Sequence, residues 1–250
     1  MLRKIFKYSF LLRIFNILFT DKEKIILITL NKILNNQKLK LRFNEPYIFN
    51  KHIRKLWYAN CLTNIVTSSL KIPDSVTKIK FEKNFNRNID IEIPNRITHI
   101  NFGGKFNKNI KNKIPNSVTN LILSCSFNQK IEGCIPNSVT HLTFGSRFNQ
   151  SLKNNIPNSV IRLIFEMVSY DNTNFKQEYI PNSVRNLYFY HTFPNNFEIP
   201  DFITTLFLPI DYFEIIEKLP TNLKILYCCE EFVINNKKLI KDNVRIEVHF

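Results

Sequence analysis

The stretch IPNSVTHLTFGSRFNQSLKNN, residues 135–155, decides the fold because related stretches precede it in the chain. Residues 114–134 read IPNSVTNLILSCSFNQKIEGC, and residues 72–92 read IPDSVTKIKFEKNFNRNIDIE. An Ile-Pro or Leu-Pro pair opens successive units of about 21 residues, at positions 72, 93, 114, 135, 156, 180, 199 and 219. Self-similarity at this period indicates a repeat protein in which each unit is one small structural element.

Each unit has the pattern of a turn, a short strand and a return segment. Apolar residues fall at unit positions 1, 5, 8, 10, 14 and 18, and positions 8 to 10 alternate as in a strand. The proline at position 2 lacks a backbone donor and disfavours helix before it, and the following Asn-Ser pair is typical of a turn. Since so small a unit cannot bury its apolar face alone, we expect equivalent strands to stack side by side in a parallel sheet.

The repeated V-x-x-L-x-F core resembles the L-x-x-L-x-L segment of leucine-rich repeats. Phe-Asn pairs at 85–86, 106–107, 127–128 and 148–149, with I-P-N-S-V-T between the last three of them, look like the FNIP repeats known from amoebae and large DNA viruses. This resemblance covers Ile72 to about Ile203 strongly and the remaining C-terminal residues weakly. It implies a leucine-rich-repeat-like β-solenoid, in which we expect the asparagines after phenylalanine to form a hydrogen-bonded ladder.

The flanking segments depart from the repeat. We expect residues 51–71 to be a degenerate first repeat that caps the stack, residues 72–239 to hold the repeats, and residues 240–250 to supply a closing strand. Three extra residues after Phe165, and the loss of the Phe-Asn pair there, predict a bulging loop. Glu230 and Glu231 are expected in a solvated turn.

The first fifty residues change to helical spacing and predict a small α-helical segment. Thr20-Asp21 offers an N-cap between two short helices. In the FNIP-repeat family such a segment is commonly an F-box, and residues 12–32 look like its core. The resemblance implies docking to a Skp-type adaptor and a cullin through Phe6, Phe10, Leu11, Ile14, Phe15 and Leu18. Alternatively, these helices only cap the solenoid.

Residue chemistry argues against an enzyme. The five cysteines are odd in number and have no C-x-x-C spacing, which disfavours disulfides and structural zinc and favours a reducing compartment. We therefore expect the cytoplasm, or the host cytoplasm if the chain is viral. His99 and His141 share unit position 7 two units apart, too far for one metal ion. We expect no cofactor, no metal site, no catalytic residue and, since no apolar run spans a bilayer, no membrane segment.

The outward positions instead favour binding. Position 9 changes along the stack from polar to aromatic residues, and the candidate partner-binding residues are Ile164, Tyr188, Tyr190, Phe207, Ile225 and Tyr227. The alternative is that the loop near residue 170 or the closing segment folds over them. Residues 163–250 carry 8 basic and 12 acidic side chains, although the whole chain has a net charge of +15. The basic half carries a stripe that could track phosphates, namely Arg87, Lys108, Lys111, Lys113, Lys130 and Lys153.

The sequence therefore predicts a non-catalytic protein-interaction protein. The favoured role is the substrate-recognition adaptor of a cullin-based ubiquitin ligase, with an unknown protein target on the exposed sheet face. The alternative is a repeat scaffold with no ubiquitin link. Nonspecific nucleic-acid binding ranks lower, because the repeated phenylalanines fall in buried columns and do not interleave with the lysines.

Overall fold

The computed structural model describes residues 47–48, 64–67, 72–90, 92–167, 175–195 and 197–248. The chain divides into two compact units, residues 1–80 and 81–250. In the first unit, strands β1 (Tyr47–Ile48) and β2 (Asn64–Thr67) pair in parallel. Strand β3 (Lys78–Phe81) lies at the boundary between the units.

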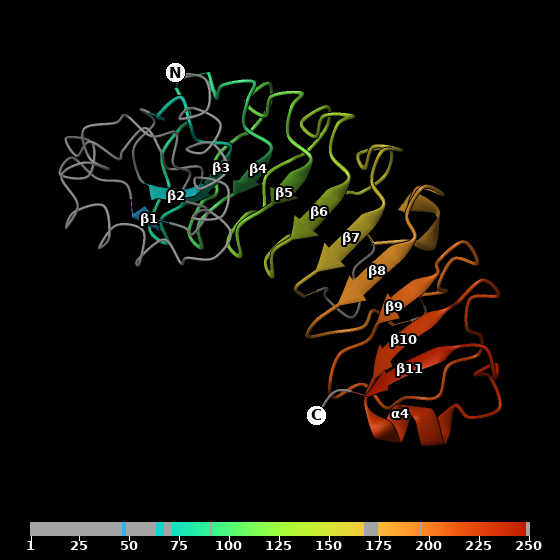
Figure 1. Cartoon of the computed structure of the whole chain (residues 1–250). Coiled ribbons are helices and arrows are strands. Elements are labelled where there is room, and N and C mark those ends of the chain that lie inside the picture. Colours follow the sequence, from blue (N-terminus) through green and yellow to red (C-terminus); the bar gives the residue numbers. More distant parts are fainter. Residues whose placement is uncertain are drawn as a thin grey trace, which may run out of the picture. The chain divides into compact units, whose positions relative to one another are not determined.

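The second unit is a row of short parallel strands (Figure 1). Each strand from β4 to β10 pairs in parallel with the next one along the chain. In order, they are β4 (His99–Asn101), β5 (Asn120–Ile122), β6 (His141–Phe144), β7 (Arg162–Phe165), β8 (Asn186–Phe189), β9 (Thr205–Phe207), β10 (Ile225–Cys228) and β11 (Arg245–Val248). The predicted parallel β-solenoid is confirmed.

The core follows the apolar columns of the sequence. Leu121, Leu142 and Leu163 are register partners at position 8 of successive units, and all three are fully buried. Position 5 valines such as Val118 and Val139 are fully buried as well. Burying one such side chain stabilises the fold by about 1.5–3 kcal/mol. Because each column continues through neighbouring units, a unit obtains its stability from the units on either side.

The phenylalanines form stacked columns inside the solenoid. The ring of Phe127 lies 6.3 Å from that of Phe106 and 6.2 Å from that of Phe148, and the interplanar angles are 2° and 4°. Within a unit, the Phe102 ring lies 4.3 Å from the Phe106 ring. Such pairs add about 0.5–1.5 kcal/mol beyond the area that they bury.

The predicted asparagine ladder is present. The backbone N–H of Asn107 donates to Asn86 Oδ1, that of Asn128 to Asn107 Oδ1, and that of Asn149 to Asn128 Oδ1, each at 2.9 Å. A second ladder, not foreseen from the sequence, runs through the position 4 serines. Ser138 Oγ, for example, donates to the Val118 carbonyl oxygen at 2.7 Å. Both ladders satisfy polar groups at the turns, so these side chains have a structural role.

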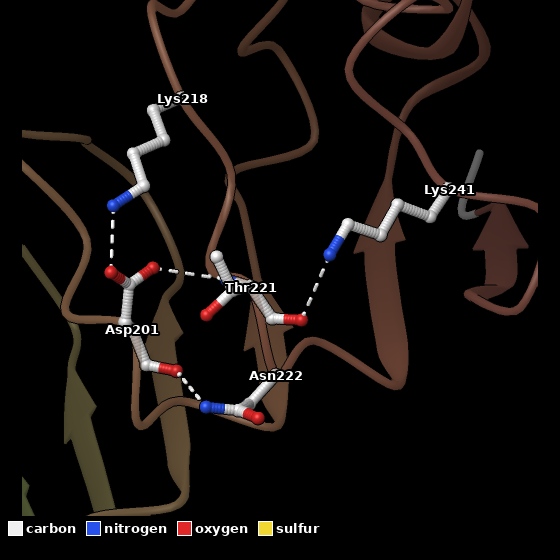
Figure 2. Close-up of polar contacts among 5 residues, drawn as sticks. All are labelled: Asp201, Lys218, Thr221, Asn222 and Lys241. Carbon is white, nitrogen blue, oxygen red and sulfur yellow. Dashed lines mark hydrogen bonds and ion pairs between the residues drawn. The ribbon is translucent and has the colours of Figure 1, made fainter.

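Polar contacts also join the C-terminal turns (Figure 2). Lys218 Nζ lies 2.7 Å from Asp201 Oδ2, and the Thr221 N–H donates to Asp201 Oδ1 at 3.0 Å. Asn222 Nδ2 donates to the Asp201 carbonyl oxygen at 2.9 Å, and Lys241 Nζ donates to the Thr221 carbonyl oxygen at 3.2 Å. The turns before β9, β10 and β11 are therefore linked in sequence.

The repeat is least regular at two places. Residues 168–174, where a bulging loop was predicted, lie outside the described residues. After them Phe175 is buried, and its ring meets the Phe165 ring edge-on at 4.8 Å. The 3-10 helix η3 (Gln177–Tyr179) follows. The expectation of a turn at Glu230 and Glu231 is wrong, because both residues belong to the first turn of helix α4 (Glu230–Asn235). Their negative charges interact favourably with the positive end of the helix dipole.

Candidate interaction surface

The outward-facing side chains form rows because the strands are in register. Positions 8 and 10 point inward in strands β6, β7, β8 and β10, whereas positions 7 and 9 are partly exposed. Register pairs run along position 9 from one strand to the next. From β5 to β11 this row contains Ile122, Thr143, Ile164, Tyr188, Phe207, Tyr227 and Glu247. Its aromatic part lies on β8, β9 and β10.

The aromatic side chains of this row contact one another. The Phe207 ring lies 5.8 Å from the Tyr188 ring and 5.7 Å from the Tyr227 ring, with interplanar angles of 26° and 30°. Tyr190 approaches from the end of β8, and its ring centroid is 5.0 Å from that of Phe207. We call the aromatic face the surface made by the six predicted residues, namely Ile164, Tyr188, Tyr190, Phe207, Ile225 and Tyr227.

The aromatic face is accessible. Tyr190 is 41% exposed, and the other five side chains are partly exposed and lie outside the buried core. The structure therefore places five of the six residues on β7 to β10 and Tyr190 directly after β8, rather than beneath another described segment. A surface of adjacent, accessible aromatic rings is typical of a site that a partner covers.

Arg162 marks the end of the aromatic face. Its guanidinium carbon lies 5.3 Å from the centre of the Tyr188 ring, a cation–π contact, and its Nε is buried with no hydrogen-bond acceptor among the described residues. Burial raises the pKa of Tyr188, an effect that Arg162 partly offsets. The pKa of His141, on the neighbouring strand, is lowered mainly by burial and, to a smaller extent, by the positive charge of Arg162. At neutral pH the Tyr188 phenol and the His141 ring are therefore uncharged.

A second apolar patch was missed by the sequence reasoning. Phe213, Ile215 and Ile234 are 46%, 77% and 68% exposed, and they lie in the return segment after β9 and in α4. Asn235 Nδ2 donates to the Phe213 carbonyl oxygen at 2.7 Å and so connects the two segments. The signal available was the run D-Y-F-E-I-I-E at 211–217, whose apolar and acidic residues do not fit the repeat columns.

The described residues assemble no metal site. No group of three or more His, Cys, Asp or Glu side chains within them is placed to hold an ion. His99 and His141 lie on β4 and β6, on either side of Asn120, and their Nδ1 atoms are 2.8 and 2.9 Å from the hydroxyls of Thr98 and Thr140. Burial raises the pKa of the Cys228 thiol to about 12, so that it packs in protonated form. None of the helices in the described ranges has the length and apolarity to cross a bilayer.

The sequence also predicted an adaptor-docking surface in the first fifty residues and a basic stripe in the return segments. The predicted adaptor-docking residues (Phe6, Phe10, Leu11, Ile14, Phe15 and Leu18) lie outside the described residues. All six cations of the basic stripe are partly or fully exposed. The nearby phenylalanines of the return segments, such as Phe106 and Phe127, are fully buried. The stripe therefore lacks the exposed aromatic rings on which single-stranded bases stack.

Comparison with known proteins identifies the class of fold. A solved structure described as the crystal structure of CroV588, a novel circular LRR protein, matches with a TM-score of 0.50 and 28% sequence identity. The match covers 83% of this chain and 39% of that one, so this chain spans about two fifths of the length of the other protein. The fold is thus a repeat solenoid of the leucine-rich-repeat type, a fold that is typically non-catalytic.

Part of the repeat region also matches a repeat family. Residues 85–126 and 127–166 match the family model described as FNIP Repeat, which confirms the resemblance seen in the sequence. A search of curated proteins gives no match. A repeat solenoid of this kind is consistent with a protein-interaction scaffold.

Proposed function

We propose that this chain is a non-catalytic recognition protein whose aromatic face binds a protein partner. The observation that carries the proposal is the contiguous row of Tyr188, Phe207 and Tyr227, with ring centroids 5.7 to 5.8 Å apart and all three side chains accessible. Aromatic side chains are enriched at protein interfaces because they bury a large area with few rotatable bonds. The outward rows of a solenoid present such residues as one broad surface.

The charge around the aromatic face favours one kind of partner. The residues that carry the face belong to the acidic part of the chain, in which residues 163–250 have 12 acidic and 8 basic side chains. A partner that inserts apolar anchors between the rings and surrounds them with lysine or arginine side chains fits this surface best. Its association is expected to be faster at low ionic strength, because opposite charges steer the encounter.

The test compares substitutions within the same row. Phe207→Ser combined with Tyr227→Ser removes two rings, whereas Asn101→Ser combined with Thr143→Ser changes the same position of other units and serves as the matched control. Partners are captured by cross-linking in cells and identified by mass spectrometry, after thermal melting has shown that both variants are folded. We expect the first variant to lose a partner that the control retains. Equal retention by both variants would contradict the proposal.

The finer role that we propose is that of a substrate-recognition adaptor. In this proposal the first fifty residues dock a Skp-type adaptor and, through it, a cullin ubiquitin ligase in the cytoplasm, while the solenoid holds the target. The support is the resemblance of residues 12–32 to an F-box core. Catalysis resides in the partners.

A pull-down of the tagged chain with a Phe15→Asp control distinguishes this role from its alternative. Recovery of a Skp-type adaptor and a cullin with the unaltered chain, and their loss with a folded Phe15→Asp variant, supports the adaptor role. Loss of solubility or thermal stability in the variant supports a segment that only caps the solenoid, and the chain is then a scaffold with no ubiquitin link. Binding at the aromatic face is independent of either outcome.

A further inference from the structure

Strand β11 is the last strand of the sheet, and its core-facing side chains are partly exposed. Ile246 and Val248 are the register partners of Leu226 and Cys228 on β10, which are fully buried. Ile246 and Val248 are instead 37% and 40% exposed. They occupy core positions, but no further strand of the described residues pairs with β11 on its outer side. An edge strand of this kind is a template for pairing with another chain.

The backbone of β11 determines which groups are available at this edge. The Arg245 N–H donates to the Lys224 carbonyl oxygen at 2.8 Å, so the hydrogen-bonding groups of Arg245 point toward β10. Because these groups alternate in direction along a strand, those of Ile246 point toward the open edge. A new strand can therefore bond to Ile246 without disturbing the pairing of β10 with β11.

We propose that two copies of this chain join through their β11 strands in an antiparallel pair centred on Ile246. In a narrow antiparallel pair, two opposed residues exchange both backbone hydrogen bonds, and Ile246 of each copy is placed to do so with the other. This register places Arg245 of each copy opposite Glu247 of the other and Val244 opposite Val248. The contact is self-complementary in charge and shape, as a two-fold interface must be.

The charged side chains of β11 already lie where the proposed dimer requires them. Arg245 and Glu247 form an ion pair within the strand, which places both on the same face of the sheet. On the opposite face, Ile246 and Val248 gain apolar neighbours when the second copy is added. Opposite charges across an antiparallel pair stabilise it, and like charges destabilise it. An arbitrary peptide strand would not provide this reciprocal pattern, and for this reason we assign the edge to a second copy.

The first test measures the oligomeric state of the full chain by sedimentation over a range of concentrations up to roughly 100 µM. We expect a monomer–dimer equilibrium. Arg245→Glu or Glu247→Arg alone places like charges opposite each other twice in the dimer, and each should raise the dissociation constant at least about tenfold. The double exchange Arg245→Glu with Glu247→Arg should restore it. A monomeric chain throughout the range, or a dimer that both single variants leave unchanged, would overturn the proposal.

A cross-linking test locates the two-fold axis. Opposed residues of a narrow antiparallel pair have Cα atoms about 5.5 Å apart, within the range of a disulfide. In a background where the exposed Cys125 is replaced by serine, Ile246→Cys should form a covalent dimer under mild oxidation. Asp242→Cys, which is exposed in the turn before β11, should not. A dimer in which Ile246→Cys fails to cross-link, or Asp242→Cys cross-links equally well, would also overturn the proposal.

Discussion

Removal of one ring from the phenylalanine column tests how the solenoid is stabilised. Phe127 is fully buried, and its ring stacks on Phe106 and on Phe148 in the neighbouring units. Phe127→Ala therefore removes apolar area from three units and leaves a cavity that stacked neighbours cannot readily close. Buried phenylalanine-to-alanine changes cost about 3–5 kcal/mol, and two lost ring pairs place this site toward the upper end.

The measurement is urea unfolding followed by far-ultraviolet circular dichroism. Phe213→Ala is the control, because Phe213 is a phenylalanine of the same chain whose side chain is 46% exposed. We expect the control to change the free energy of unfolding by less than about 1 kcal/mol. Hydrogen exchange should quicken in the units on both sides of Phe127 as well as in its own unit. Equal losses for the two variants would refute the idea that the ring column couples neighbouring units.

Three further predictions concern polar groups and turns. Asn107→Ala removes the acceptor for the backbone N–H of the next asparagine, and we expect a loss of about 1–2 kcal/mol in urea unfolding. Gly145→Ala would place a methyl group 2.1 Å from the Ser124 carbonyl oxygen, so its melting temperature should fall by several degrees. The hydrogen bond and ion pair with Lys218 lower the pKa of Asp201 from its usual value of 3.8. The contribution of this carboxylate to folding stability is therefore present above pH 3.8 and is lost as the pH falls through the lower pKa of the folded state. Asp201→Asn should abolish this acid-side loss in melts between pH 7 and pH 2, whereas an unchanged profile would contradict the role of the pair.

The repeating part of the fold could be predicted from the sequence because the same unit positions are buried in every unit. The spacing of Val118, Leu121, Leu123 and Phe127 identifies the inward positions, and the structure buries all four. The asparagine ladder was predictable for the same reason, since an identical residue at an identical position meets its equivalent one unit away.

The irregular parts could not be predicted in this way. Phe175 supplies the ring that the repeat places six residues earlier, and no column assigns it to the core. The helix of Glu230 and Glu231 and the exposed patch of Phe213 and Ile215 lie where the units depart from the pattern. The outward direction of Tyr188 and Phe207 followed from alternation, but their mutual contact depended on the register of β8 with β9.

The asparagine and serine hydrogen-bond ladders allow the number of repeat units to change. The amide oxygen of Asn107 meets the next unit, the Ser138 hydroxyl meets the previous one, and neither reaches further along the stack. Insertion or deletion of one whole unit would therefore recreate the same bonds at the new junction. Evolution can lengthen or shorten such a protein in steps of one unit, and so fit its reach to a partner, without redesigning the units that remain.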